Sequence, residues 1–250
     1  MVPDRPGQGA AHGGGTHAAA AGGDGMTVVD LEQAGTPRRK PWVRSCGELG
    51  KHISRTVGGL QARLLRDAPD PEAVSTLARL RRGIGRVPGF DYTLERYLQV
   101  PPHLLGHRPA DDAEAADAEY AAHDAVTLYA LHQQSRRERM HSPGHGLGQA
   151  LAALVRASRS PEGVRRRFAA LGTASSYPES VYHLRSLIVM LREQQIPLDY
   201  GLLADDLKTL RQPALRPRVQ AVWGREFFRS NPNDATDTDG VTPDPEENAS

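Results

Sequence analysis

The sequence predicts an all-α protein of about nine helices packed as a compact helical bundle, with a disordered tail at each end. Leu and Ala predominate over Val and Ile, a bias that favours helix over sheet. Apolar residues recur at steps of three and four through residues 38–229, and no alternating Val-, Ile- or Thr-rich stretch competes for strand. The two ends of the chain lack this periodicity.

The chain of 250 residues divides into three parts. Residues 1–37 contain GGG and AAAA runs with scattered proline, so they cannot bury enough apolar surface to become ordered. Residues 38–229 form the predicted helical domain. Residues 230–250 hold six acidic and no basic side chains, and we expect them to be a disordered acidic tail.

The amino-acid composition indicates the cellular compartment in which the protein works. The single cysteine, Cys46, excludes an internal disulfide and fits a reducing cytosol. No apolar run approaches the roughly 18 residues that a membrane span needs, and the N-terminus has no hydrophobic signal core. The sequence therefore predicts a cytoplasmic protein without a membrane partner.

The first three predicted helices follow from periodicity and caps. The first has a stripe of apolar residues at steps of four and three, and the second begins at Asp70-Pro71, an N-cap followed by a first-turn proline. The second ends in ARLRRGIGR, where two glycines close it, and a short helix over 92–98 precedes a proline-rich link. The residues expected to face inward are Leu49, Ile53, Val57, Leu60, Leu64, Val74, Leu77 and Leu80.

A long helix over 111–134 is expected to be the centre of the bundle. Ala121, Ala125, Leu128 and His132 lie on one line of it, and His132 is predicted to be a hydrogen-bonded core histidine. An exposed, arginine-dense end follows at 133–139, then a break at SPGHGLG, because proline cannot continue a helix. The next helix places one apolar face inward, with Leu147, Leu151, Leu154 and Val155.

Four more helices complete the predicted bundle. Ser160-Pro161 repeats the cap-and-proline signature, and Ser176 opens the helix after that. The sequence IPLDY turns the chain into the penultimate helix. The inward residues expected in this half are Val164, Phe168, Leu171, Val181, Leu184, Leu187, Ile188, Leu191, Leu202, Leu203, Leu207, Val219, Val222, Trp223 and Phe227.

Charge points to a polyanionic partner. The whole chain has a net charge of +1, but residues 38–229 hold 30 basic and 20 acidic side chains, a net charge of +10. Nearly all of these cations are arginine. A GC-rich genome would explain the preference for arginine over lysine but not the net excess. Nucleic acid is therefore the first candidate partner.

Catalytic and metal sites are not predicted. His141 and His145 have HxxxH spacing, but Pro143-Gly144 separates them, so they do not share a helical face. The GHGLG segment lacks the lysine and the preceding strand of a phosphate-binding loop. We expect a tight interhelical turn there, whose amides could still contact one phosphate. No nucleophile, base and acid form a set, so neither an enzyme nor a cofactor is expected.

Seven motifs occur in order along the predicted domain. They are ARLRRGIGR (78–86), TLYALHQQS (127–135), MHSPGHGLGQAL (140–151), VRRRFAAL (164–171), HLRSLIVMLR (183–192), IPLDYGLLADDL (196–207) and VWGREF (222–227). Together they resemble the CasB family, the small subunit of the type I-E CRISPR Cascade complex. The resemblance covers about residues 40–229 and leaves both tails unmatched.

The resemblance implies an all-α, non-catalytic subunit. Such a subunit is present as a pair, so its partners include a second copy of itself. It contacts the subunits that coat the guide RNA and the large subunit, and it helps to hold the separated strands of the target DNA. Guide RNA and target DNA are thus the implied nucleic-acid partners.

Arginines are the expected binding residues, because a guanidinium contacts backbone phosphate without reading sequence. Two other functions stay open: a free-standing helical DNA- or RNA-binding protein, and a purely structural adaptor. Carried over from the motifs, the candidate nucleic-acid contacts are Arg79, Arg81, Arg82, Arg86, Arg166, Arg167, Arg185 and Arg225. Arg136, Arg137 and Arg139 follow, with less support from the motifs.

Overall fold

The computed structural model describes residues 44–105 and 112–230. These ranges contain nine α-helices, four short 3-10 helices and no strand, apart from one isolated bridge between His141 and Leu198. The predicted all-α class is therefore confirmed. The predicted tails, 1–37 and all but the first residue of 230–250, lie outside the described residues.

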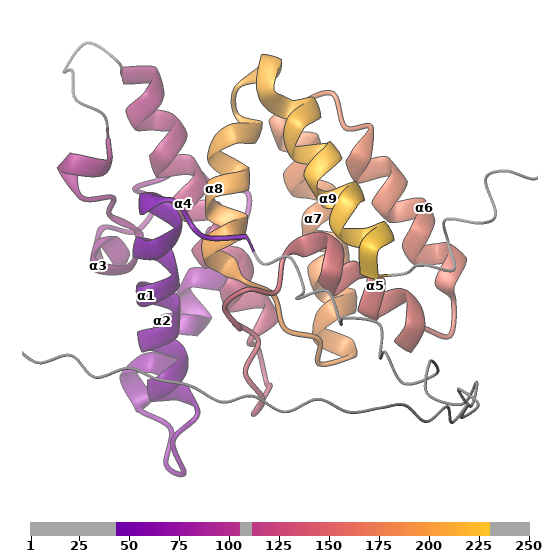
Figure 1. Ribbon diagram of the computed structural model, residues 1–250. Coiled ribbons are helices and arrows are strands. Elements are labelled where there is room, and N and C mark those ends of the chain that lie inside the picture. The colour runs from indigo at the N-terminus through magenta and orange to yellow at the C-terminus, as the bar shows by residue number, and fades with distance from the viewer. Residues whose placement is uncertain (1–43, 106–111, 231–250) are drawn as a thin grey trace, which may run out of the picture. The chain divides into compact units, whose positions relative to one another are not determined.

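The helices of the N-terminal part lie together on one side of the domain (Figure 1). Helix α1 begins directly after a short extended segment, and its predicted apolar stripe is buried as expected. The bounds are α1 Glu48–Leu64, α2 Pro71–Leu80, η1 Arg81–Gly83, η2 Tyr92–Leu94, α3 Glu95–Leu98 and η3 Pro102–Leu104. The short helix expected over 92–98 is thus a 3-10 turn that continues into one α-helical turn.

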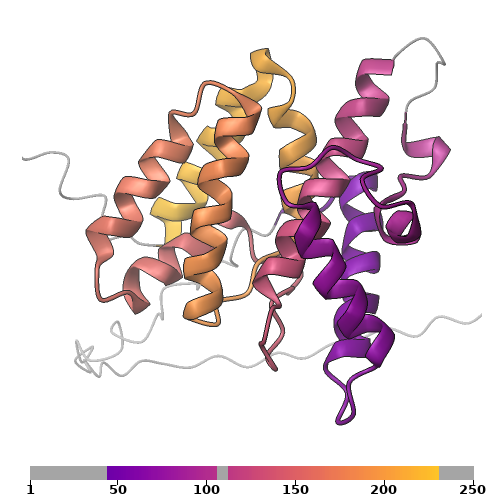
Figure 2. The same cartoon turned by 180° about the vertical axis from the view of Figure 1, so that it is seen from behind.

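Helix α4, Asp112–His132, is the central helix of the fold. It packs against α1, α2, α3, α7 and α8, and Figure 2 shows α2 crossing it. Every residue from 121 to 130 is buried, including His123, Asp124 and Thr127. The sequence predicted one buried line of residues on this helix. The buried surface is wider than predicted, because neighbouring helices cover α4 on all sides.

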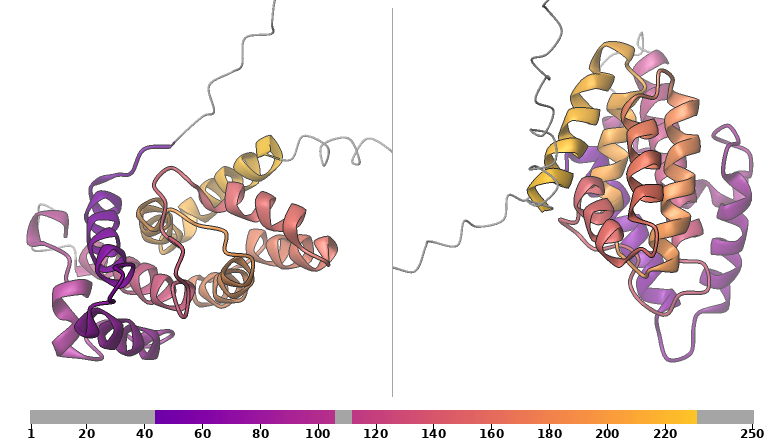
Figure 3. Two further views of the ribbon diagram at one scale, coloured as in Figure 1. Left: turned by 90° about the horizontal axis from the view of Figure 1, so that it is seen from below. Right: turned by 90° about the vertical axis from the view of Figure 1, so that its right-hand side faces the viewer.

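The second group of helices packs beside α8 (Figure 3). Helices α6, α7 and α9 run side by side, α5 packs against α9, and α8 contacts α1, α4 and α9. Helix α8 therefore joins the two groups. The bounds are α5 Leu147–Ala157, α6 Pro161–Gly172, α7 Tyr177–Glu193, α8 Tyr200–Leu210, η4 Pro213–Leu215 and α9 Arg216–Ser230.

Two of the three predicted serine or aspartate caps are confirmed. Asp70 accepts hydrogen bonds from the first amides of α2, and Ser176 accepts one from the Glu179 amide in α7. Ser160 occupies the N-cap position of α6 but makes no side-chain cap. A further cap was missed: Asp199 accepts from the Gly201 and Leu202 amides at the start of α8.

Helices α1 and α5 take their caps from distant helices instead. Asp205 of α8 accepts from the Gly47 and Gly50 amides at 2.7 and 2.9 Å, and Glu226 of α9 accepts from the Gly148 amide at 3.0 Å. A carboxylate is favourable there because the free amides and the helix dipole make each N-terminus positive.

Arg44 joins the two capping helices. Its guanidinium makes a bidentate pair with Asp206 at 2.9 and 2.8 Å, and its Nε lies 3.1 Å from Glu226 Oε1. Burial raises the pKa of Asp206 and of Glu226, and Arg44 opposes that rise by favouring the charged carboxylates. Arg44 therefore offsets part of the cost of burying two carboxylates where α8 meets α9.

The prediction that certain apolar residues face inward is wrong. Val74 of α2 is 49% exposed, and Ala73 and Thr76 are buried in its place. Phe168, Val181 and Val222 are only partly buried because they lie at the edges of their helical faces. None of the helices in the described ranges is long and apolar enough to cross a membrane.

Candidate nucleic-acid interface

The arginine-rich segment 79–86 sends its four guanidinium groups in different directions. Arg79 pairs with Asp91, Nη2 to Oδ2 at 2.6 Å, and so ties α2 to η2. Arg81 and Arg86 line two separate hollows, while Arg82 is exposed and has no partner among the described residues. The segment therefore does not present its four arginines on one surface.

The first hollow lies between α2 and the loop that follows α4. We call it the arginine groove; it has a volume of about 320 Å³. Apolar side chains line it together with three arginines, one from the ARLRRGIGR motif and two from the loop after α4. Its lining residues are Leu64, Pro69, Val74, Leu77, Ala78, Arg81, Gln133, Ser135, Arg136 and Arg137.

Gln133 fixes the loop that carries the groove's arginines. Its Nε2 donates to the Arg136 and Glu138 carbonyls at 3.0 and 2.9 Å, and its Oε1 accepts from the Met140 amide at 3.2 Å. Gln133 is buried, so the expectation that residues 133–139 are exposed throughout is wrong. The residues that follow it are therefore held in one defined loop.

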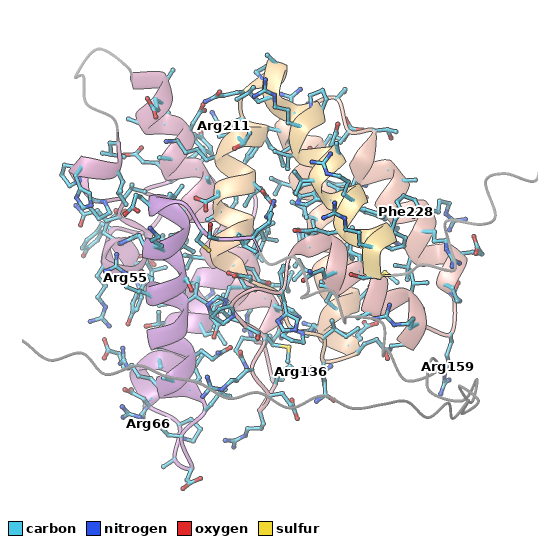
Figure 4. All side chains as sticks on the ribbon, in the orientation of Figure 1. Arg55, Arg66, Arg136, Arg159, Arg211 and Phe228 are labelled. Atoms are coloured by element: carbon cyan, nitrogen blue, oxygen red, sulfur yellow. The ribbon has the colours of Figure 1, made fainter. Side chains whose placement is uncertain are left out.

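Arg136 has the most unusual environment in this groove. Its side chain is half-buried, and its Nε is buried without a hydrogen-bond partner among the described residues. A buried N–H without a partner costs about 1–3 kcal/mol, more for a charged group. Figure 4 shows Arg136 in the lower middle of the view.

The second hollow lies among α4, α7 and the segment after η1. We call it the tyrosine pocket; it has a volume of about 410 Å³. Arg86 and Arg185, two of the predicted contacts, both line it, as does Arg211 at the end of α8 (Figure 4). Arg211 was missed by the sequence analysis, which had no reason to place α8 beside α4.

The remaining predicted arginines line neither hollow. Arg139, Arg166 and Arg225 are exposed and have no partner in the part of the chain that the structure describes. Arg167 donates to the Gly163 carbonyl at 2.9 Å, one turn earlier in α6. The structure thus brings together Arg81 with Arg136 and Arg137, and Arg86 with Arg185, but leaves the others dispersed.

The glycine-rich turn before α5 does not offer its amides to a phosphate. The Gly144 amide donates to Asp199 Oδ2 at 2.7 Å, and the Gly148 amide donates to Glu226. The Gly146 amide lies 3.3 Å from Gln149 Oε1. The interhelical turn is therefore confirmed. These three amides already have protein acceptors, so they do not favour the possible phosphate contact.

Two of the histidines singled out in the sequence, His132 and His141, belong to the core, whereas His145 is exposed. His132 is fully buried, with Nδ1 3.0 Å from the Tyr200 hydroxyl, and burial lowers its pKa to about 3. His141 Nδ1 accepts from the Tyr200 amide at 3.2 Å, and burial lowers its pKa as well. His132 is thus confirmed as a hydrogen-bonded core histidine. Within residues 44–105 and 112–230, no three His, Cys, Asp or Glu side chains form a metal-binding group.

Comparison with known proteins agrees with this architecture. Residues 76–228 match the family described as CRISPR-associated protein Cse2. The crystal structure of CasB from Thermobifida fusca is 43% identical, covers 73% of this chain and 99% of that one, and superposes with a TM-score of 0.59. None of the curated proteins matches the sequence significantly.

Two further solved structures are similar at lower identity. A chain of a "CRISPR RNA-guided surveillance complex" is 21% identical, covers 76% of this chain and 99% of that one, and has a TM-score of 0.55. CasB from M. ruber is 24% identical over 73% of this chain and 98% of that one, with a TM-score of 0.48. The family match extends over more than half of the sequence and agrees with the CasB resemblance of its motifs. The chain therefore belongs to the Cse2 family of CRISPR-associated proteins, the family of CasB.

Proposed function

We propose that this protein is the non-catalytic small subunit of a type I-E Cascade complex. In this role it binds nucleic-acid backbone and so stabilises the pairing of guide RNA with target DNA and the displaced strand. The observation that carries the proposal is the arginine groove. Three guanidinium groups from two distant segments converge there, and one of them has a buried donor without a partner among the described residues.

Arginine suits this function physically. Its planar fork of five donors matches phosphate oxygens, and it stays charged at any physiological pH. Exchange of a DNA duplex for an RNA–DNA heteroduplex is nearly balanced in free energy, so a few protein contacts to the backbone are enough to favour the open state. Contacts of this kind hold strands of any sequence, as a subunit serving many guides requires.

The proposed partners follow from membership in the Cse2 family. They are guide RNA, target DNA, the guide-coating subunits, the large subunit and a second copy of this chain, all in the cytoplasm. The similarity to a chain of an RNA-guided surveillance complex supports this setting. The dispersed candidates Arg82, Arg139, Arg166 and Arg225 would then contact other parts of the same path or the neighbouring subunits.

The test compares two double variants that remove the same charge. Arg81→Ala with Arg137→Ala removes two guanidinium groups from the groove. Arg159→Ala with Arg218→Ala removes two exposed arginines that line no hollow and were not among the candidates. DNA binding by the full chain and by the assembled complex is measured across salt concentrations. The groove variant should bind all sequences more weakly, with a salt slope shallower by roughly 1.5, or 0.7–0.9 per contact.

The control variant should keep most of the affinity and slope of the wild type. Equal losses in the two variants would mean that only total charge matters, which contradicts a specific groove. Unchanged binding by the groove variant would overturn the proposal for this surface. Because these side chains reach the surface, thermal melting should be unchanged in both, and this is checked first.

A second function, the purely structural adaptor, is favoured by one observation. An apolar groove between α6 and α9 has a volume of about 780 Å³ and includes Phe168, Phe227 and the half-exposed Phe228 (Figure 4). If the adaptor role predominates, Phe228→Ser should impair assembly of the complex while the arginine-groove variant assembles and binds DNA normally. The opposite pattern supports nucleic-acid binding.

A further inference from the structure

The tyrosine pocket combines features that the arginine groove does not have. Its lining includes three tyrosines, Tyr120, Tyr177 and Tyr182, besides its three arginines. Tyr182 is 72% exposed on α7, and Arg185 lies one turn later on the same helix. An exposed tyrosine beside free arginines is the pattern of surfaces that stack single-stranded bases and hold their phosphates.

The rim of the pocket can hold phosphates. Arg86 and Arg185 are exposed and have no partner among residues 44–105 and 112–230. They come from segments far apart in the chain, one after η1 and one in α7. Two unpaired guanidinium groups at one opening attract an anionic chain and leave the space between them for its base.

The interior of the pocket is rigid and has one carboxylate. Arg211 lies 4.2 Å over the Tyr120 ring and 5.0 Å over the Tyr177 ring, and its Nε donates to Asp117 at 2.6 Å. The Tyr177 hydroxyl donates to Asp124 Oδ2 at 2.7 Å. The other oxygen of Asp124 has no hydrogen-bond partner among the described residues, although the side chain is only 6% exposed.

A free carboxylate oxygen selects among bases. Burial raises the pKa of Asp124, and the Tyr177 hydroxyl and Arg211 oppose that rise. The ionised form is acceptor-only, so this form favours a base with an exocyclic amine, such as the N4 amine of cytosine. Thymine would direct a carbonyl oxygen at it. At about 410 Å³ the pocket is in the size range of small-ligand sites and has room for one base.

We propose that the tyrosine pocket binds one unstacked, amino-bearing nucleobase of a single strand, with the flanking phosphates on Arg86 and Arg185. This inference rests on the proposed nucleic-acid function and extends it from backbone contact to base contact. The base stacks on Tyr182 at the opening and donates to Asp124 at the floor. The displaced DNA strand, whose bases are unpaired, is the strand of the proposed complex that can supply such a base.

The experiment measures binding of the full-length chain to oligo-dC, to oligo-dT and to an abasic strand of the same length. The abasic strand measures the contribution of the backbone alone, so the difference between the strands reports contacts to the bases. The variant is Tyr182→Ala, and the matched control is Tyr92→Ala, a tyrosine that is 83% exposed and lines no hollow. Tyr182→Phe retains the ring and serves as the conservative variant.

The wild type should bind oligo-dC several-fold more tightly than oligo-dT. Tyr182→Ala should bind oligo-dC about tenfold more weakly, as expected for loss of one base stack. Tyr92→Ala and Tyr182→Phe should bind like the wild type, and Tyr182→Ala should not weaken binding to the abasic strand. Asp124→Asn exchanges an acceptor for a donor, so it should reduce or reverse the preference for oligo-dC over oligo-dT.

Other outcomes separate the two proposals. Equal affinity of the Tyr182→Ala and Tyr92→Ala chains for oligo-dC would overturn the base pocket and leave the arginine groove standing. Loss of complex assembly in Tyr182→Ala, with unchanged oligo-dC binding, would assign the pocket to a protein side chain and also overturn it. Failure of the wild-type chain to bind any single strand would overturn both proposals.

Discussion

Trp223 shows how one side chain can join packing and electrostatics. It is fully buried in α9, and its Nε1 donates to Asp206 Oδ2 at 2.7 Å, beside the Arg44 guanidinium. The ring therefore cannot stack on a nucleic-acid base without unfolding of the helix. Its position supports the expectation that it anchors the last helix to the core.

Truncation of this side chain should strongly destabilise the fold. Trp223→Ala should lower the free energy of unfolding by around 3–5 kcal/mol, because a large cavity opens and Asp206 loses a donor. Chemical denaturation measures the change. Trp223→Phe, which retains most of the volume, should cost less. A melting curve unchanged in Trp223→Ala, together with lost DNA binding, would contradict the anchoring role.

His132 makes stability depend on acid. Its pKa in the folded protein is about 3, below the ordinary value of 6.5, so the folded state binds fewer protons than the unfolded state. The contribution of neutral His132 to the free energy of unfolding is complete above pH 6.5 and declines as the pH falls toward 3. Between pH 7 and 4.5 this histidine alone should remove about 2–3 kcal/mol from the free energy of unfolding.

Measurement of this effect needs a reference chain. His132→Asn places a neutral polar group near the Tyr200 hydroxyl and cannot titrate in this range. The buried acids Asp206 and Glu226 have raised pKa values, which shift stability in the opposite direction as the pH falls, and both chains retain them. The difference between the two chains therefore isolates His132. Parallel pH profiles would rule out the proposed protonation.

The identities of the candidate residues were more predictable than their arrangement. A motif identifies Arg81 and charge identifies Arg136 and Arg137, but only the fold brings η1 beside the loop after α4. The ion pair between Arg79 and Asp91 was equally unpredictable, because an acid twelve residues away in a loop gives no periodic signal. For Tyr182 a signal did exist, since it precedes Arg185 by one helical turn.

At the scale of elements, local signals were reliable. The apolar stripe of α1 and the Asp70-Pro71 start of α2 are set by residues within a few turns, and both are confirmed. The burial of α4 on every side was not predictable, because its alanines fit either a narrow stripe or a surrounded helix. Caps supplied by α8 and α9 to other helices lie beyond any local pattern.

The close contact of α5 with α9 explains the glycine in the first turn of α5. A Cβ on Gly148 would lie 2.1 Å from the Trp223 carbonyl oxygen and 2.8 Å from the Phe227 nitrogen, both backbone atoms that cannot yield separately. Only glycine therefore permits the two helices to approach so closely. The same residue donates its amide to Glu226, so the contact also completes the cap of α5.

Substitution at this position should separate the helices. Gly148→Ala should lower the free energy of unfolding by about 1–3 kcal/mol or more through overpacking. The control is Gly59→Ala in α1, where a Cβ would meet nothing within 4 Å. That change should raise stability by about 0.5–1 kcal/mol, because alanine favours the helix. Equal effects in the two variants would contradict the close approach.

For the whole molecule, the distribution of charge is the main consequence of the sequence. The net charge of +10 in residues 38–229 is followed by a segment with six acidic residues and no basic ones. Tethered at the end of α9, these carboxylates should compete weakly with phosphate for the arginines. Exposed pairs are worth about 1 kcal/mol at most and are screened by salt, so the effect should be several-fold.

A chain truncated after Ser230 tests this competition. It should bind non-specific DNA several-fold more tightly than the full chain at low salt, and the difference should vanish as salt rises. Titration of both chains with a labelled duplex at two salt concentrations gives the comparison. Equal affinities at low salt would assign the acidic residues a solubilising role alone.

The capping of α1 by α8 has a consequence for synthesis on the ribosome. The Gly47 amide is made 158 residues before the carboxylate of Asp205 that accepts it, and Arg44 precedes Asp206 by 162 residues. At about 5–20 residues per second, the first turn of α1 waits roughly 8–30 s for its cap. The first turn of α1 therefore lacks its cap until α8 has been synthesised. A chain that ends before α8 would never acquire this cap, and we expect it to be less stable and to be degraded.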